Sequence, residues 1–160
     1  MKTFTDRQGR DWPVEITVGS IKRVRDLCGV NLLDIADGTG GVLQRLYTDP
    51  IFLCDVLYCL IKPTADERVV TDEDFGRMLS GDALDTAAEA VLGELTDFFP
   101  KGRRKVMQTI TMKTGLMMEA MLARAGKLAD EIDVEKVVQS LSGPASNGGP
   151  GAGSSADSAE

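Results

Sequence analysis

Closely spaced acidic side chains are the residues of this sequence that could bind a metal ion. Asp34 and Asp37 stand three residues apart and precede the segment Gly-Thr-Gly-Gly at 38–41, and the segment 72–74 reads Asp-Glu-Asp. Neither has the spacing of a calcium-binding loop, a phosphate-binding loop or a dinucleotide-binding turn. We therefore expect a helix end at Asp34 and Asp37. Residues 72–74 should lie in a first helical turn, where the helix dipole favours carboxylates.

The sequence contains no histidine. Serine and cysteine nucleophiles that depend on an imidazole base are therefore excluded, and so are zinc sites with histidine ligands. No other pair of nucleophile and base stands out. We expect a protein that is not an enzyme and that has no catalytic residues, no metal and no cofactor.

The three cysteines, Cys28, Cys54 and Cys59, are an odd number and lack the spacing of a metal site. Each has apolar neighbours in the sequence. We expect three reduced thiols that act as small core residues, as is usual in a reducing cytosol.

Charge is distributed unevenly along the chain. The total is 18 Lys and Arg against 25 Asp and Glu, a net charge of −7, which argues against sequence-independent binding of nucleic acid. Residues 49–100 hold 12 acidic and 3 basic residues, whereas residues 101–128 hold 7 basic and 1 acidic residue. These two blocks could pair within one molecule or between copies of it.

Asp55 and the basic cluster at 101–105 are candidates for binding a partner. Asp55 interrupts the apolar run 51–61, where a buried carboxylate would need a partner. It could pair with a basic residue of segment 103–128, face another subunit, or point to a wetter edge of its helix, which the pattern favours. Arg103 and Arg104 could begin a solvated helix or bind an acidic partner.

Five of the seven methionines lie between residues 107 and 121. Methionine is flexible and polarisable, so methionine-rich surfaces bind varied apolar partners, although ordinary core filling is the simpler interpretation. Adjacent Met117 and Met118 lie about 100° apart on a helix and cannot share one narrow face. We name four as candidate binding residues: Met112, Met117, Met118 and Met121.

The N-terminal segment predicts a β-hairpin that leads into a helix. Segments 2–5 and 11–18 flank a polar turn at 6–10, and apolar residues alternate along the second segment. Pro13 has no N–H group, so this strand should lie at a sheet edge. The next helix should span 18–28, with Gly29 after its end.

The remaining apolar periodicity predicts a series of helices. The segment 50–61 is apolar almost all round, so we place it at the centre of the core, with Asp49 as its cap and its end at Pro63. The segment 64–70 should be a linker. The other expected helices are 32–36, 42–47, 72–79, 83–99, 103–128 and 133–141.

The expected fold is α+β and mainly α, with a two-stranded N-terminal hairpin packed on a bundle of about five to seven helices. Residues 1–142 should form a single domain. Residues 143–160 are rich in Gly, Ser and Ala and lack large apolar side chains, so we expect a disordered tail. The apolar run 51–61 is too short to span a membrane, and no signal peptide is evident, so we expect a cytoplasmic protein.

The order of the N-terminal elements carries a family resemblance. The chain has first the strand 12–18 and then the helical segment from Ile21 to Val24. The residues Gly29-Val30-Asn31-Leu32 follow and lead into the helical body. This order resembles the start of tail assembly chaperones of long-tailed bacteriophages and related prophages. The resemblance covers residues 3–36, and residues 37–142 share only the helical character of that family.

The resemblance implies a protein that binds other chains. Such chaperones bind the long, hydrophobic tape-measure protein before the tail tube polymerises around it, tend to self-associate and are absent from the mature virion. For this chain it implies the tape-measure protein as partner, self-association, and a place in the cytoplasm of the bacterial host cell. The alternative is a structural virion component, such as a tail completion or head–tail connector protein.

Overall fold

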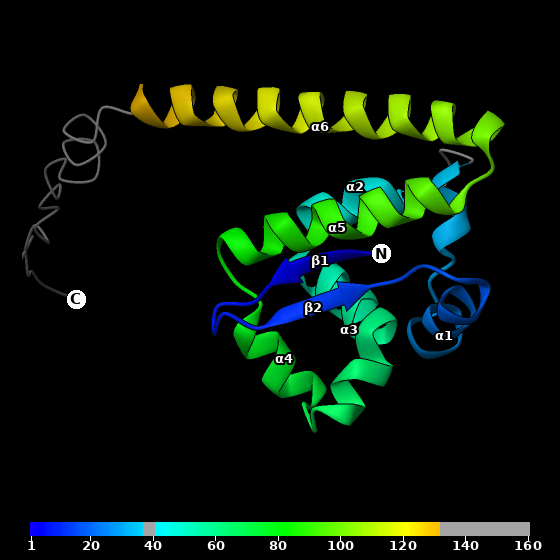
Figure 1. Ribbon diagram of the computed structural model, residues 1–160. Coiled ribbons are helices and arrows are strands. Elements are labelled where there is room, and N and C mark those ends of the chain that lie inside the picture. The colour runs from blue at the N-terminus through cyan, green and yellow to red at the C-terminus, as the bar shows by residue number, and fades with distance from the viewer. Residues whose placement is uncertain (37–40, 132–160) are drawn as a thin grey trace, which may run out of the picture. The chain divides into compact units, whose positions relative to one another are not determined.

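The computed structural model describes residues 1–36 and 41–131 of the chain. Within these residues it shows the expected α+β fold, with one antiparallel two-stranded hairpin and six α-helices (Figure 1). The elements are β1 (Lys2–Thr5), β2 (Asp11–Val14), α1 (Val18–Cys28), the 3₁₀ helix η1 (Leu32–Ala36), α2 (Val42–Thr48), α3 (Pro50–Glu67), α4 (Asp72–Met78), α5 (Asp82–Phe98) and α6 (Lys101–Asp130).

The chain divides into two compact units, residues 1–121 and residues 122–160. The first unit contains every element from β1 to α5 and most of α6. The expected helix at 133–141, the expected domain boundary after residue 142 and the expected disordered tail at 143–160 all lie outside the described residues.

The hairpin is shorter than the sequence predicts. Strand β2 ends at Val14, because Thr17 already caps α1 and Ser20 donates a hydrogen bond to the carbonyl of Glu15 at 3.1 Å. This capping box draws residues 15–17 out of the ladder. Pro13 pairs in register with Thr3, at the sheet edge where a residue without an N–H is tolerated.

Asp6 organises the turn between the two strands. Its buried carboxylate accepts hydrogen bonds from the backbone N–H groups of Gln8 and Arg10 at 2.8 and 3.0 Å. It also accepts bonds from Arg10 Nε and Trp12 Nε1, each at 2.9 Å. Burial by itself would raise the pKa of Asp6, but the bonds from Trp12, Arg10 and Gln8 outweigh it and hold the pKa below its usual range.

An aromatic cluster joins the hairpin to the helices beneath it. Trp12 is fully buried and meets the ring of Phe75 in α4 edge-on, with 5.5 Å between ring centroids. Phe4 of β1 and Tyr58 of α3 also lie against Phe75, at 6.3 and 6.0 Å. Arg68 covers the Trp12 ring at 4.7 Å and donates to the carbonyl of Asp11.

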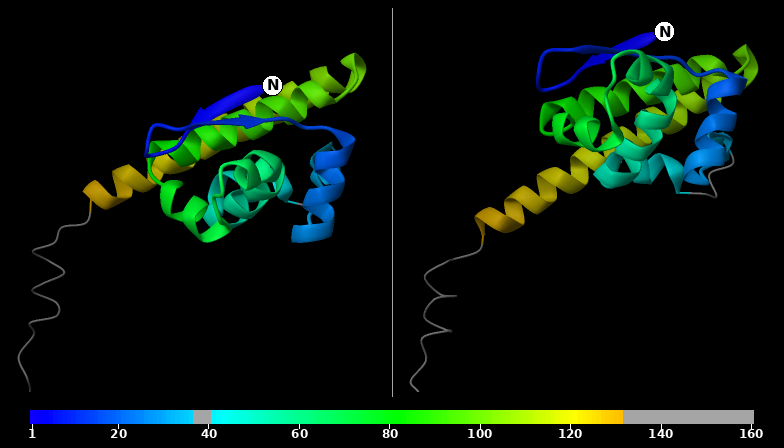
Figure 2. Two further views of the ribbon diagram at one scale, coloured as in Figure 1. Left: turned by 60° about the horizontal axis from the view of Figure 1, so that its bottom comes forward. Right: turned by 90° about the horizontal axis from the view of Figure 1, so that it is seen from below.

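Helix α3 is the centre of the core, as its apolar sequence predicts. Helices α1, α2, α4 and α5 and strand β2 all pack against it, while β1 packs along α5 (Figure 2). At Gly93 of α5 an added Cβ atom would overlap the flexible end of the Lys2 side chain, which would have to move aside. Asp49 caps α3 as expected and accepts a hydrogen bond from the N–H of Phe52 at 3.0 Å.

The expected end of α3 at Pro63 is wrong, because the helix continues to Glu67 and takes up most of the expected linker. Proline cannot donate to the carbonyl four residues earlier, which here belongs to Cys59. Arg23 of α1 supplies the missing donor: its Nη1 lies 3.1 Å from the carbonyl oxygen of Cys59 and 3.4 Å from that of Leu60. Across the proline, an ion pair of 2.8 Å between Lys62 and Asp66 supports the last turns.

We predict that Asp6→Asn destabilises the fold by about 1–3 kcal/mol at pH 7, because it weakens four hydrogen bonds to a buried charged group. The native pKa of Asp6 is lowered, so the stabilisation is complete above the unfolded pKa and is lost as the pH falls through the native pKa. Urea unfolding of both proteins between pH 7 and pH 3 should show the difference shrinking below about pH 4. Glu15→Gln, at an exposed position, is the control, and a difference that does not change with pH would contradict this role.

The contact between Arg23 and the Pro63 break predicts a coupling that a double-mutant cycle can measure. Arg23→Ala should cost about 1–2 kcal/mol in the natural sequence, because it leaves the Cys59 carbonyl without a donor. In a Pro63→Ala background the restored backbone N–H bonds that carbonyl, so the same change should cost about 1 kcal/mol less. Equal costs in both backgrounds would show that Arg23 acts independently of the proline.

Candidate partner-binding surface

Helix α6 presents one face to the body of the protein along residues 104–118. Met107 is 2% exposed, and half-buried residues recur on the same side every three or four positions. At Gly115 an added Cβ atom would lie 3.8 Å from the hydroxyl of Tyr47 in α2, so the helix passes close to the body there. The half-buried residues of this inner face include Arg104, Ile110, Thr111, Thr114, Gly115 and Met118.

A second row of apolar side chains on α6 is exposed. Met117 lies eleven residues after Val106, which is close to three helical turns, and Met121 lies one turn beyond Met117. By the same spacing Met121 follows the half-buried Ile110, so this row borders the inner face. Each of the three exposed residues has an exposed fraction between 53% and 57%. We call Val106, Met117 and Met121 the outer stripe.

The candidate methionines divide between these two faces. Met117 and Met121 belong to the outer stripe, whereas Met118 is half-buried on the inner face. Met112 is 62% exposed and lies on another side of the helix, one turn before the exposed Leu116. The methionine count did not reveal the exposed Val106 and Leu116, although the eleven-residue spacing of Val106 and Met117 is visible in the sequence.

Arg103 and Arg104 have different surroundings. Arg104 folds back on the end of α5 and donates to the carbonyl oxygens of Asp97 at 2.8 Å and Phe99 at 3.3 Å. It therefore supplies donors to carbonyls that the end of a helix leaves without backbone partners. Arg103 is exposed, three residues before Val106, and exposed Lys113 stands four residues before Met117, so both cations flank the outer stripe.

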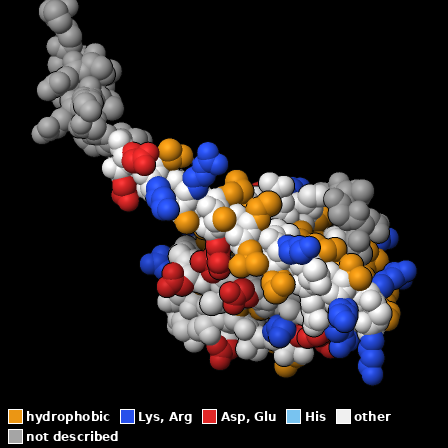
Figure 3. Space-filling model, turned by 90° about the horizontal axis from the view of Figure 1, so that it is seen from above, with side chains coloured by type: hydrophobic (Ala, Val, Ile, Leu, Met, Phe, Trp, Pro, Cys, Tyr) orange, Lys and Arg blue, Asp and Glu red, His pale blue; other side chains and the backbone are white. Residues whose placement is uncertain are grey.

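No ion pair joins the basic segment to the acidic block within residues 1–36 and 41–131. Figure 3 looks onto the side that carries α6 and shows apolar, basic and acidic side chains at the surface. Among the described residues, the cations of α6 are therefore not neutralised by direct contact with carboxylates.

Asp55 does not share a site with the α6 residues. Its side chain is exposed, which agrees with the wetter edge that the pattern favours, and no described residue of segment 103–128 forms an ion pair with it. It lines a shallow cleft of about 320 Å³ together with Asp72 of α4. Partial desolvation first, and then the charges of Asp72 and Asp49, raise the pKa of Asp55.

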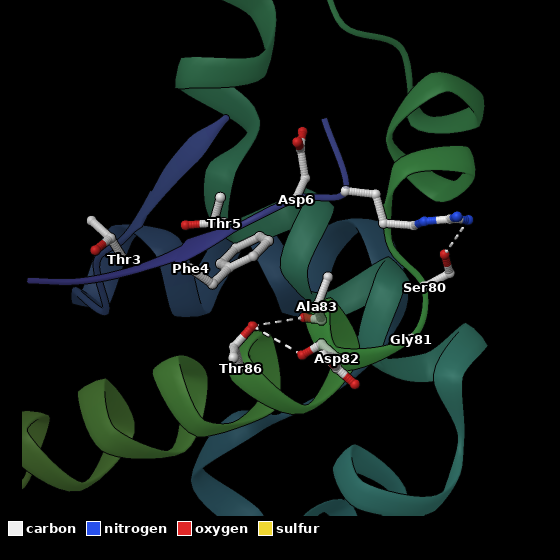
Figure 4. A pocket seen from close by; sticks show the side chains of 10 residues that line it. Thr3, Phe4, Thr5, Asp6, Ser80, Gly81, Asp82, Ala83 and Thr86 are labelled. Carbon is white, nitrogen blue, oxygen red and sulfur yellow. Dashed lines mark hydrogen bonds between the residues drawn. The ribbon is translucent and has the colours of Figure 1, made fainter. Parts of the chain in front are cut away.

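A cleft of about 780 Å³ lies between β1 and the start of α5 (Figure 4). Arg7 crosses one end and donates to the hydroxyl of Ser80 at 3.0 Å. Thr86 donates to backbone carbonyls of its own helix, and the carboxylate of Asp6 is held by the hairpin. The ten lining residues thus offer no nucleophile beside a free base.

Comparison with models of protein families, with curated proteins and with solved structures gives no match to this chain. Within the described residues, no group of three or more acidic or cysteine side chains is placed to hold a metal ion. No helix in this part of the chain combines the length and apolar character needed to cross a membrane. The described part of α6 exposes several large apolar side chains, including Val106, Met112, Leu116, Met117 and Met121.

The two faces of α6 predict opposite responses to the same substitution. Met107→Gln should destabilise the protein by about 2–4 kcal/mol, because it places an amide in the core. Met117→Gln and Met121→Gln should each change the free energy of unfolding by less than about 0.5 kcal/mol, because their side chains already face solvent. Denaturant unfolding of the three variants measures this, and a large loss at Met117 would assign it to the core.

Proposed function

We propose that this protein is a tail assembly chaperone of a bacteriophage or prophage, which binds the tape-measure protein and keeps it soluble before the tail tube polymerises. The observation that carries the proposal is the outer stripe of α6, where Val106, Met117 and Met121 expose large apolar side chains beside the inner face. An exposed apolar row on a soluble protein marks a binding surface.

The chemistry of the outer stripe favours an amphipathic helix as its occupant. An apolar helical segment can lay its own apolar face along such a row, with anchors three or four residues apart. The thioethers of Met117 and Met121 adapt to side chains of different shape, which suits a chaperone that meets many segments of one long chain. Arg103 and Lys113 beside the stripe favour segments that carry acidic residues on their flanks.

One such contact is weak, and the proposed function needs only weak contacts. Burying one large apolar side chain contributes about 1.5–3 kcal/mol, and the cost of association removes much of that gain. Several copies of the chaperone along one tape-measure chain would keep its apolar segments covered. The polymerising tail tube could then displace each copy in turn.

The N-terminal elements support the same proposal. The resemblance to tail assembly chaperones rests on a hairpin, a helix and a step at Gly29, and the described structure contains these elements as β1, β2 and α1. Gly29 adopts a left-handed conformation with φ of 66°, and its N–H caps α1 by donating to the carbonyl of Arg25.

Co-expression with the tape-measure protein encoded by the same phage or prophage tests the proposal. The tape-measure protein should become soluble and co-purify with this chain, and it should aggregate when expressed alone. If it stays insoluble and does not co-purify, the chaperone function is wrong. Stoichiometric amounts of this chain in purified particles would instead support a structural virion component.

Exposed apolar residues outside α6 provide matched control variants for the outer stripe. The double variant Met117→Gln, Met121→Gln should lose at least tenfold in the amount of soluble tape-measure protein. Leu27→Gln on α1 and Ile51→Gln on α3 also remove exposed apolar side chains, but away from α6, and should leave the yield unchanged. Equal losses in all variants would show that general surface hydrophobicity, rather than α6, holds the partner.

A further inference from the structure

Two of the three cysteines meet between α1 and α3. Cys28 is the last residue of α1 and Cys59 lies near the middle of α3, yet their sulfur atoms are 2.8 Å apart. A disulfide bond joins two sulfur atoms at about 2.05 Å, so closing the bond needs a movement of about 0.8 Å. Cys54 lies five residues before Cys59 on the same helix and does not take part in this contact.

Other contacts between α1 and α3 hold the two cysteines in place. The Cys28 thiol also donates to the carbonyl of Asp55 at 3.5 Å, one turn before Cys59. Five residues before Cys28, Arg23 binds the carbonyl of Cys59 itself. The backbone on both sides of the thiol contact is therefore already held in place by other bonds between the same two helices.

We propose that Cys28 and Cys59 are an oxidisable pair whose intramolecular disulfide locks α1 onto α3 without unfolding the protein. A peroxide is the oxidant class that the reaction requires. The Cys28 thiol loses its proton and its sulfur attacks one peroxide oxygen, which gives a sulfenic acid and a hydroxide ion that takes up this proton to become water. The sulfur of Cys59 then attacks the sulfur of Cys28 and releases the hydroxyl group as a second water. The two thiols together lose two electrons and two protons, and one hydrogen peroxide is reduced to two waters.

The order of these steps follows from exposure. Cys59 is 5% exposed, and burial first, then its contact with Cys28, raise its pKa above the usual range of a thiol. It therefore remains protonated at neutral pH and is shielded from solvent. Cys28 is partly exposed, so the oxidant reaches it first, and Cys59 acts as the resolving thiol that a redox pair needs.

The disulfide would close a chain segment of 31 residues that contains η1, α2 and the first part of α3. Cross-linking a segment of that length restricts the unfolded chain and should raise Tm by roughly 10 °C. Cys54 is an internal reference thiol, which should not enter the disulfide. Burial raises the pKa of its thiol to about 11, and its contacts lie toward Gly76 of α4.

Thiol titration of the full chain before and after treatment with hydrogen peroxide tests the pair. The natural protein and Cys54→Ser should each lose two thiols, and mass spectrometry of peptides should show Cys28 joined to Cys59 with two hydrogens lost. Tm should rise by roughly 10 °C on oxidation and return to its starting value with dithiothreitol. Cys28→Ser should show no oxidation-dependent rise in Tm.

Three outcomes would overturn the proposal. The first is retention of all three thiols in the folded protein under peroxide that oxidises the urea-unfolded chain. The second is a disulfide that involves Cys54 or that joins two molecules. The third is a fall in Tm on oxidation, which would show that the bond strains the α1–α3 contact instead of locking it. These measurements are made on the natural protein, so they do not depend on whether a cysteine variant folds.

Discussion

Arg23 donates to the carbonyl oxygens of Cys59 and Leu60 at the point where Pro63 interrupts the hydrogen bonds of α3. This contact supports the last turns of α3, the helix against which four other helices and β2 pack. A break at Pro63 would remove the last turn of α3 and the buried Ala65 within it. One guanidinium from α1 thus lets a proline-containing helix serve as the core.

The turn of the N-terminal hairpin is held by a second set of polar contacts that follows the same principle. Asp6 is a buried carboxylate, and it is tolerated because Gln8, Arg10 and Trp12 donate to it. The bond to Trp12 orients the indole against Phe75. In both places a charged side chain forms hydrogen bonds with nearby groups. These bonds fix the arrangement of the apolar residues around it.

Helix α6 differs from these buried parts of the described fold. Its inner face buries Met107, while the outer stripe stays in solvent and carries flexible methionines. The outer stripe borders this inner face, and its side chains remain exposed to a partner. The proposed redox pair lies between α1 and α3, so a change in its oxidation state and the binding of a chain to α6 concern different helices.

Much of the local structure was predictable from the sequence, because short-range chemistry determines it. Asp49 and Pro50 mark the start of α3, Gly29 marks the end of α1, and the all-round apolar pattern of 51–61 places α3 in the core. The side of a helix that meets the body was not predictable, since Met117 and Met118 are adjacent and identical in type.

Only the tertiary structure decided the contacts between distant residues. Pro63 fails to end α3 because Arg23, forty residues earlier, supplies the missing donor. For the same reason Cys28 and Cys59 read as separate core residues in the sequence, although the packing of α1 on α3 brings their sulfur atoms together. Local propensity specifies where a helix can form, whereas the partners that complete its hydrogen bonds come from elements that only folding brings into contact.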